Sequence, residues 1–323
     1  MNILIVSGFL GAGKTTFIKE LIRRTSTNPV ILENEYGDNT IDAVELRSSK
    51  PGEKKLEILE FMEGCVCCTM KDSFVNSVLT VYSGLSPEYL IIEPTGVGKL
   101  SNIINNIRPL LHGDIRLLKP VVVITPRSFT QNMNEWGDLY KDQVANAEIV
   151  VFSKCENESP SVLDMTESAI RNINPNAEIV KKHYSHQSDE WWRSCMDIDA
   201  ADTDAIGSGD SISDFSQITI NDAHLSNPSE LIILLEDCLK GELGHIARAK
   251  GTIPVGDETL RFDLADGLYS ITGSPQPDNQ CVFIGRSLDK AGILRRLNST
   301  LLGKEVSIAR AYVNRKNHSN WLA

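Results

Sequence analysis

A glycine-rich segment near the N-terminus constrains the fold of this chain more than any other feature. Residues 8–15 read GFLGAGKT and follow the apolar run of residues 3–6. The residues after them, 16–24, carry apolar side chains at helical spacing. A glycine-rich turn between a strand and a helix lets backbone N–H groups face an anion, and the helix N-terminus favours negative charge there. The segment therefore predicts a phosphate-binding loop, in which Lys14 reaches the outer phosphates and the Thr15 hydroxyl completes a magnesium shell.

The length and charge of the chain limit its class. The 323 residues exceed the usual size of one domain, so we expect one large and one smaller domain. A formal net charge of −11 argues against binding to nucleic acid or to an anionic membrane surface. No segment approaches the roughly 20 apolar residues of a membrane span, and no secretory signal is recognisable. The sequence therefore predicts a cytoplasmic protein, whose seven cysteines, an odd number, are reduced.

Strand-like runs and helix-period stretches alternate along the first half of the chain. The apolar runs lie at residues 2–7, 29–33, 56–61, 88–93, 120–125, 148–153 and 177–180. Helical spacing occurs at residues 15–24, 72–84, 99–111, 134–146 and 160–173. This alternation is typical of a doubly wound, mostly parallel α/β sheet, whose binding crevice lies at the carboxyl ends of the strands. With the phosphate loop it predicts a P-loop NTPase domain over residues 1–184.

The composition changes after residue 184. Residues 185–216 carry eight acidic side chains against one basic and little periodicity, which predicts an acidic linker over residues 185–214. The Trp191-Trp192 pair in it is expected to anchor the segment on the first domain rather than to face a partner. Strand-like runs and two helical stretches then predict a smaller α+β domain over residues 215–323. The runs lie at 215–220, 246–255, 259–264, 267–272 and 281–286, and the helices at 231–239 and 289–302.

Three of the seven cysteines, Cys65, Cys67 and Cys68, follow the third strand-like run. Thiolates are soft ligands that suit zinc, cobalt, nickel or cuprous ions, and three within four residues can converge on one ion. Three ligands leave a tetrahedral ion one short, which suits a site that releases its metal. Glu33 and Asp38 lie at the carboxyl end of the second run and can supply the missing ligand if the two strands are neighbours. The alternative is that the cysteines simply pack as small buried side chains.

Two further strand ends carry polar side chains. Glu93 ends the fourth run and Gly96 follows it, where a carboxylate can orient magnesium-bound water and a glycine permits close approach to a terminal phosphate. Ser153 ends the sixth run, and Lys154 and Glu156 follow it. There an acidic group can accept two N–H bonds from guanine while a lysine stem covers the ring. Short motifs of this kind also occur in ordinary polar loops.

The motifs GFLGAGKTTF, ENEYGD, GCVCC, EPTG and SKCE occur in this order along the chain. In this combination the chain resembles the CobW-like family of metal-handling GTPases, relatives of the nickel-enzyme maturation and cobalamin-chaperone GTPases. RAKG at residues 248–251 and CVFIGR at residues 281–286 look like the C-terminal domain of that family. The resemblance therefore covers nearly the whole chain apart from the linker.

The resemblance implies a GTPase of low intrinsic rate that binds GTP, Mg²⁺ and either Zn²⁺ or Co²⁺. It implies that hydrolysis is coupled to delivery of the transition metal to a client metalloprotein or a cobalamin-pathway protein, and that two copies can pair as a homodimer. Carried onto this sequence, it implies that the phosphates are bound by Gly8, Gly11, Ala12, Gly13, Lys14, Thr15 and Thr16. It further implies a magnesium pair of Thr15 and Glu93, a catalytic set of Lys14, Glu93 and Gly96, base contacts from Ser153, Lys154 and Glu156, and a transition-metal site of Cys65, Cys67, Cys68, Glu33 and Asp38.

Some positions depart from the family pattern. Glu156 stands where the family usually has aspartate, and its longer side chain predicts an altered preference for the base. Gly98-Lys99 and Thr125-Pro126 replace pairs that usually contain an acid, which affects how the nucleotide is sensed. His183 and His186 have ligand-like spacing but are expected to be solvated.

Two other functions fit the residues. A P-loop kinase for a small metabolite uses the same loop to aim a phosphoryl group at an acceptor, but gives no role to the cysteines. A nucleotide-gated switch with negligible turnover fits the altered positions.

Overall fold

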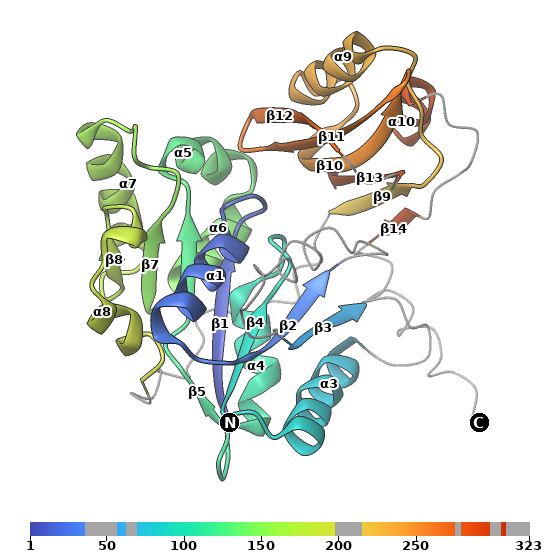
Figure 1. Cartoon of the computed structure of the whole chain (residues 1–323). Helices are drawn as coiled ribbons and strands as arrows, with labels where there is room; N and C mark the ends of the chain where they lie inside the picture. The colour runs from blue at the N-terminus through green and yellow to red at the C-terminus, as the bar shows by residue number, and fades with distance from the viewer. Residues whose placement is uncertain (36–56, 63–69, 198–214, 275–278, 298–304, 308–323) are drawn as a thin grey trace, which may run out of the picture. The chain divides into compact units, whose positions relative to one another are not determined.

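The computed structural model describes residues 1–35, 57–62, 70–197, 215–274, 279–297 and 305–307. These residues form two compact units, the first built from β1 to α8 and the second from β9 to β14 (Figure 1). None of the described helices is both long enough and apolar enough to cross a bilayer.

The first unit is built on a parallel sheet. Among the described residues, eight strands form this sheet in the order β3-β2-β4-β1-β6-β7-β8, with β5 paired to β1. All pairings between neighbouring strands of this sheet are parallel. The strands are β1 (Asn2–Gly8), β2 (Val30–Glu35), β3 (Glu57–Met62), β4 (Tyr89–Glu93), β5 (Arg116–Leu117), β6 (Val121–Ile124), β7 (Ile149–Phe152) and β8 (Glu178–Val180). The side chains of β6 and β7 are buried throughout, which explains their continuous apolar runs. The expected parallel α/β sheet is confirmed, and it places the carboxyl ends of these strands at one edge.

Helices lie on both faces of this sheet (Figure 1). They are α1 (Lys14–Thr25), α3 (Met70–Leu85), α4 (Leu100–Ile107), η1 (Arg108–Leu110), α5 (Pro126–Glu135), α6 (Gly137–Ala145), α7 (Pro160–Ile173), η2 (Tyr184–His186) and α8 (Asp189–Ser194). Helix α6 confirms the helix predicted over residues 134–146, whereas α5, which ends just before Trp136, was not predicted. Helix α5 buries the polar side chains of Ser128 and Asn132 beside Phe129, so the apolar period of its inward face is interrupted.

Helix α8 lies inside the stretch expected as a linker. Ser188 caps it, since its Oγ accepts a hydrogen bond from the backbone N–H of Trp191 over 3.2 Å. Trp192 is fully buried, and its ring centroid is 5.1 Å from that of Phe17 on α1 and 5.9 Å from that of Tyr184. This tryptophan therefore anchors residues 189–194 as a packed helix on the first unit. The remainder of the expected linker, residues 198–214, lies outside the described residues.

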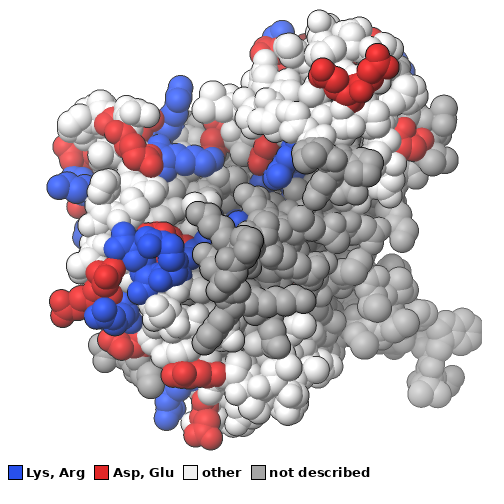
Figure 2. All heavy atoms as spheres, viewed as in Figure 1, with Lys and Arg blue, Asp and Glu red and all other residues white. Residues whose placement is uncertain are grey.

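Charged side chains also join α8 to α1. Glu20 accepts hydrogen bonds from Arg23 and Arg24, and Arg24 donates to Asp189 of α8 over 2.7 Å. The hydrogen bonds from Arg23, and then from Arg24, lower the pKa of Glu20 from 4.5 to about 2. On the face drawn in Figure 2, basic and acidic side chains are interspersed. The ion pair between Arg24 and Asp189 therefore joins the surface of α1 to α8.

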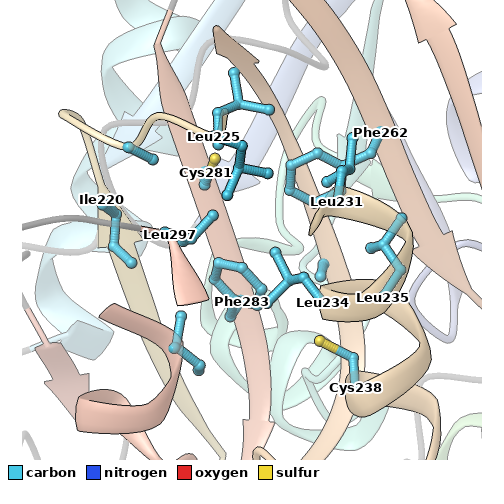
Figure 3. Packing of buried hydrophobic residues seen from close by; sticks show 14 of the residues in the cluster. Ile220, Leu225, Leu231, Leu234, Leu235, Cys238, Phe262, Cys281, Phe283 and Leu297 are labelled. Atoms are coloured by element: carbon cyan, nitrogen blue, oxygen red, sulfur yellow. The ribbon is translucent and has the colours of Figure 1, made fainter. Parts of the chain in front are cut away.

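The second unit is an antiparallel sheet covered by helices. Among the described residues, six strands lie in the order β12-β11-β10-β13-β9-β14. They are β9 (Ser216–Ile220), β10 (His245–Val255), β11 (Glu258–Ala265), β12 (Leu268–Gly273), β13 (Gln280–Arg286) and β14 (Glu305–Ser307), with helices α9 (Pro228–Leu239) and α10 (Lys290–Arg296). Figure 3 shows leucines of α9 packed on Phe262 and Phe283 of the sheet. The expected α+β layout is confirmed, although β14 was not predicted.

Candidate nucleotide-binding site

The loop between β1 and α1 has the backbone shape that phosphate binding needs. Gly11 and Gly13 adopt positive φ angles of 75° and 94°, a region that favours glycine. Gly8 has a φ of 142°, and a Cβ there would lie 2.4 Å from the carbonyl oxygen of Val123 on β6. The N-cap of α1 is Gly13, so no side chain of that residue competes for the first N–H groups of the helix. The loop therefore ends at an open helix N-terminus, a site that attracts anions.

Lys14 holds its charge inside this loop. Its side chain is 7% exposed, and Nζ donates hydrogen bonds to the carbonyl oxygens of Gly8 (3.1 Å) and Phe9 (3.3 Å). A nearly buried ammonium gains strongly from an anionic partner, because the desolvation of the charge is already complete. As the first residue of α1, Lys14 places that charge beside the open N–H groups of the helix.

Thr15 and Glu93 are brought together from distant parts of the sequence. Thr15 is the second residue of α1, and Glu93 is the last residue of β4, the strand beside β1. Thr15 Oγ1 donates a hydrogen bond to Glu93 Oε1 over 2.8 Å. Glu33 lies on the neighbouring strand β2, in register with Glu93, and is only 2% exposed. A hydroxyl and carboxylates at one sheet edge are the hard oxygen ligands that Mg²⁺ prefers.

Gly96 touches the phosphate loop directly. A Cβ at Gly96 would lie 2.4 Å from the backbone nitrogen of Leu10, 2.7 Å from its Cα and 2.8 Å from the carbonyl carbon of Phe9. Distances this short to backbone atoms leave no room for any side chain. The turn is closed by a hydrogen bond from the Gly98 N–H to the Thr95 carbonyl oxygen (2.9 Å). A shift of this turn towards Leu10 would therefore displace the backbone of the phosphate loop.

The segment after β7 meets the phosphate loop through one residue. Ser153 is 2% exposed, and its Oγ donates to the carbonyl oxygen of Ala12 over 2.5 Å. Lys154 has a left-handed φ of 51° and is exposed. Glu156 is exposed too, with 52% of its side chain accessible. Ser153 is thus fixed to the loop, while Lys154 and Glu156 stay accessible to a ligand beside it.

The sequence predicts that His183 is solvated, but this residue is largely buried. Its side chain is 17% exposed, and its ring centroid lies 4.2 Å from that of Tyr184. Nδ1 is 2.7 Å from Ser185 Oγ, and Nε2 is 3.5 Å from Glu156 Oε1. The histidine therefore borders the carboxylate that was predicted to read the base, a relation that the spacing of the histidines could not reveal.

Most of the expected transition-metal site lies outside the described residues. Cys65, Cys67, Cys68 and Asp38 belong to segments that the structure does not describe, so Glu33 is the single member that it places. Within the described ranges, no three histidine, cysteine or acidic side chains gather in a way that could hold a metal ion.

The four described cysteines are poor candidates for metal ligands. These residues, Cys155, Cys195, Cys238 and Cys281, are free and buried. Burial raises the pKa of each thiol, to about 12 for Cys195 and Cys238, which keeps the sulfur protonated near neutral pH. Since a metal binds the thiolate, these four thiols are structural.

Two polar side chains of α6 also reach the site, although the sequence motifs did not predict them. Gln143 is 1% exposed and hydrogen-bonds the backbone of the turn at residues 96–98, while its neighbour Asp142 binds Ser101. A signal was present, because Gln143 shares the inward face of α6 with the apolar side chains of Leu139 and Tyr140. A polar residue at a core position of a helix usually has a specific partner.

Two family models match this chain. Residues 2–181 match the model described as CobW/HypB/UreG, nucleotide-binding domain. Residues 215–301 match the model described as cobalamin synthesis protein cobW C-terminal domain. The first match alone covers more than half of the chain.

Curated proteins are similar in sequence to this chain, and the similarity covers a different share of each. The zinc chaperone YeiR of Escherichia coli is 30% identical over 159 residues, which cover 48% of this chain and 47% of YeiR. The zinc-regulated GTPase metalloprotein activator 1 of Dictyostelium discoideum is 23% identical over 215 residues, 56% of this chain and 45% of that protein. The chain thus spans about half the length of these relatives. The zinc chaperone YjiA of Escherichia coli is 22% identical over 329 residues, 90% of this chain and 96% of YjiA. The crystal structure of Zn(II)-bound YjiA superposes with a TM-score of 0.42 at 18% identity, covering 92% of this chain and 98% of that one.

Proposed function

This chain belongs to the CobW/HypB/UreG family of metal-handling GTPases, and from that membership we propose that it is a GTP-hydrolysing metallochaperone. In this proposal it binds GTP with Mg²⁺ at the phosphate loop and carries zinc or cobalt at its cysteine loop. Hydrolysis releases the metal to a client, a metalloprotein or a protein of the cobalamin pathway. The curated relatives named as zinc chaperones favour zinc as the cargo.

The hydrogen bond between Thr15 and Glu93 is the observation that carries the proposal. It joins a phosphate-loop hydroxyl to a carboxylate at the end of the adjacent strand, 78 residues further along the chain. Both groups are hard oxygen donors, so the residues present fit Mg²⁺. A bound Mg²⁺ supplies charge that stabilises the transferring phosphoryl group. Thr15 and Glu93 would hold the ion, and Glu93 would also orient the attacking water.

The phosphate loop supports binding of a triphosphate. The open N–H groups at the start of α1 and the enclosed ammonium of Lys14 both favour anions. Gly96 packs against Leu10 of the phosphate loop, which supports its assignment as the sensor of the third phosphate. Lys14, Glu93 and Gly96 therefore make up the proposed catalytic set, with Gly96 acting through its backbone.

Base recognition is assigned to the segment after β7. Ser153 is fixed to Ala12 of the phosphate loop, so the next residues start from a defined point. The accessible side chain of Lys154 can cover a purine ring, and the Glu156 carboxylate can accept the two N–H bonds of guanine. Guanine is therefore the proposed base, with Glu156 deciding how strongly it is preferred.

The cargo site is assigned to Cys65, Cys67 and Cys68, with Glu33 and Asp38. Strand β3, which ends at Met62 shortly before the cysteines, runs parallel to β2 and is its direct neighbour. Carboxyl ends of neighbouring parallel strands meet at one sheet edge, so segments that follow them start close together. The four other thiols are buried and protonated, which leaves this cluster as the thiolate site of the chain.

The two sites can be coupled through Glu33 and Glu93. These residues stand in register on β2 and β4, so the proposed magnesium ligand and the proposed metal ligand are adjacent positions of one sheet. Loss of the third phosphate releases segments that it had ordered, a common way for nucleotide hydrolysis to change a neighbouring site. We expect such a change to loosen the bound zinc.

Steady-state phosphate release tests the enzymatic part of this proposal. Zinc-loaded protein is mixed with GTP or ATP and Mg²⁺, and free phosphate is followed over many turnovers. We expect slow release that prefers GTP and that is lost in Lys14→Ala. Transfer of phosphate to a small metabolite would favour the kinase, and stoichiometric nucleotide binding without release would favour the switch.

A zinc titration tests the cargo site. Cys67→Ser should weaken zinc binding, because a hydroxyl is a poor replacement for a soft thiolate. Cys238→Ser is the matched control, since it removes one of the buried, protonated thiols. Equal zinc affinity of Cys67→Ser and the unaltered protein would contradict the assignment.

A further inference from the structure

Helix α6 and the residue before it pack against the phosphate loop. The ring of Phe9, in the loop, lies with its centroid 5.5 Å from that of Tyr140 on α6. It is also 5.9 Å from the ring of Trp136, the residue that precedes α6. All three aromatic side chains are buried. Large aromatic contacts of this kind fix a loop firmly, because moving it exposes apolar surface.

The same helix holds the turn that touches the phosphate loop. Gln143 lies one helical turn after Tyr140, and its Nε2 donates to the carbonyl oxygens of Gly98 (3.1 Å) and Gly96 (3.4 Å). In a planar trans peptide the N–H points opposite to the C=O. Drawing the Gly96 and Gly98 carbonyls towards Gln143 therefore directs the N–H groups of Val97 and Lys99 away from α6. One amide group thus sets the orientation of two peptide planes.

A second contact from α6 fixes the end of this segment. Asp142 accepts hydrogen bonds from the backbone N–H of Ser101 (3.1 Å) and from its hydroxyl (2.5 Å). Ser101 lies in the first turn of α4, whose N–H groups lack helical acceptors. Asp142 and Gln143, adjacent in sequence, therefore clamp both ends of residues 96–101 onto α6.

We propose that Gln143 is a positioning residue for recognition of the third phosphate, acting through the turn at residues 96–98. This inference rests on the proposed function, because it assumes that this turn senses the terminal phosphate of GTP. Gln143 touches no nucleotide itself. It keeps Gly96 pressed against Leu10, so that the turn and the phosphate loop present one rigid surface supported by α6.

The role predicts a selective loss of affinity. In the proposed role, a diphosphate would contact the phosphate loop but not the turn, whereas a triphosphate would contact both. Gln143→Met keeps the side-chain volume and removes both donors. We expect the affinity for a non-hydrolysable GTP analogue to fall about tenfold, the size of one to two neutral hydrogen bonds, while GDP affinity changes less than about twofold. The rate of GTP hydrolysis by Gln143→Met should fall together with its affinity for the GTP analogue.

Asn174→Leu is the matched control. Asn174 is a second amide that hydrogen-bonds α6, but at its far end. Its Nδ2 donates to the carbonyl oxygens of Val144 and Ala145, the last two residues of α6, and of Ala147 just beyond it. Its loss weakens the packing of α6 without touching residues 96–98. We expect lower thermal stability and an unchanged ratio of GTP-analogue to GDP affinity. A second variant, Ser101→Ala, removes only the hydroxyl contact to Asp142 and should give a smaller loss in the same selective direction.

The experiment measures both affinities by calorimetry for the full chain and these three variants, with circular dichroism to verify folding. An equal loss of GDP and analogue affinity in Gln143→Met, or no loss, overturns the positioning role. Should Gln143→Met fail to fold, an unchanged affinity ratio in Ser101→Ala overturns it instead. If the unaltered protein binds neither nucleotide, the proposed function fails. A selective loss confined to Gln143→Met and Ser101→Ala supports the inference.

Discussion

Thr15 Oγ1 donates a hydrogen bond to Glu93 Oε1 over 2.8 Å, so the start of α1 and the end of β4 share one polar contact. This contact keeps two proposed magnesium ligands within reach of each other. It also means that neither group needs to move far to bind the ion. Preorganised ligands of this kind lower the cost of binding.

Glu93→Gln should weaken the binding of Mg²⁺ and slow hydrolysis. The amide keeps the shape of the side chain and can still accept from Thr15, but it lacks the charge that a divalent cation needs. We expect a loss of about 10–100-fold in magnesium affinity, measured by titration of the GTP-analogue complex. Glu190→Gln, an exposed position of α8, is the control. Unchanged magnesium affinity in Glu93→Gln would remove this carboxylate from the site.

Gly96→Ala should disturb the contact between the turn and the phosphate loop. The added methyl would meet backbone atoms of Leu10, which cannot rotate away. We expect destabilisation of about 1–3 kcal/mol and a larger loss of affinity for a GTP analogue than for GDP. Gly84→Ala is the control, because a Cβ there meets nothing within 4 Å and Gly84 lies in helix α3. Urea unfolding should show Gly84→Ala to be at least as stable as the unaltered protein.

Glu156→Asp should sharpen the preference for guanine over adenine. Aspartate is one methylene shorter, which draws the carboxylate back from His183 and towards the position usual in the family. The measurement is the ratio of GTP to ATP analogue affinity, with Glu158→Asp in the same loop as control. A ratio equal to that of the unaltered protein would mean that Glu156 does not contact the base.

Glu20→Gln should destabilise the protein at neutral pH and not at low pH. The pKa of Glu20 is lowered in the folded state, from 4.5 to about 2, chiefly by the hydrogen bond from Arg23. A lowered folded pKa adds stability above pH 4.5 that is lost as the pH falls towards 2. We expect a difference of about 0.5–1 kcal/mol in urea unfolding at pH 7, shrinking steadily below pH 4.5. A difference independent of pH would contradict the ionic role of Glu20.

The strands and the phosphate loop could be predicted because their signals are local. Val121 to Ile124 of β6 is buried on both faces, so it appears in the sequence as a continuous apolar run. The glycines of the loop are identified by spacing alone, since only they tolerate its positive φ angles.

The missed features depend on contacts between distant residues. Helix α5 escaped detection because its inward face carries Asn132, whose partners are Ser128 and Tyr140. Helix α8 was hidden in an acidic stretch, where only the burial of Trp192 reveals it. The role of Gln143 needs the turn at residues 96–98 to lie beside α6, a relation that no spacing in the sequence encodes.

The central claim is that nucleotide and zinc binding are coupled, and a zinc titration in two nucleotide states tests it most directly. Metal-free protein is saturated with Mg²⁺ and either GDP or a non-hydrolysable GTP analogue, and the dissociation constant for Zn²⁺ is measured in each state. Our account predicts tighter zinc binding in the triphosphate state by about 5-fold or more, the lower range of typical coupling between two sites. Equal zinc affinity in the two states would contradict it.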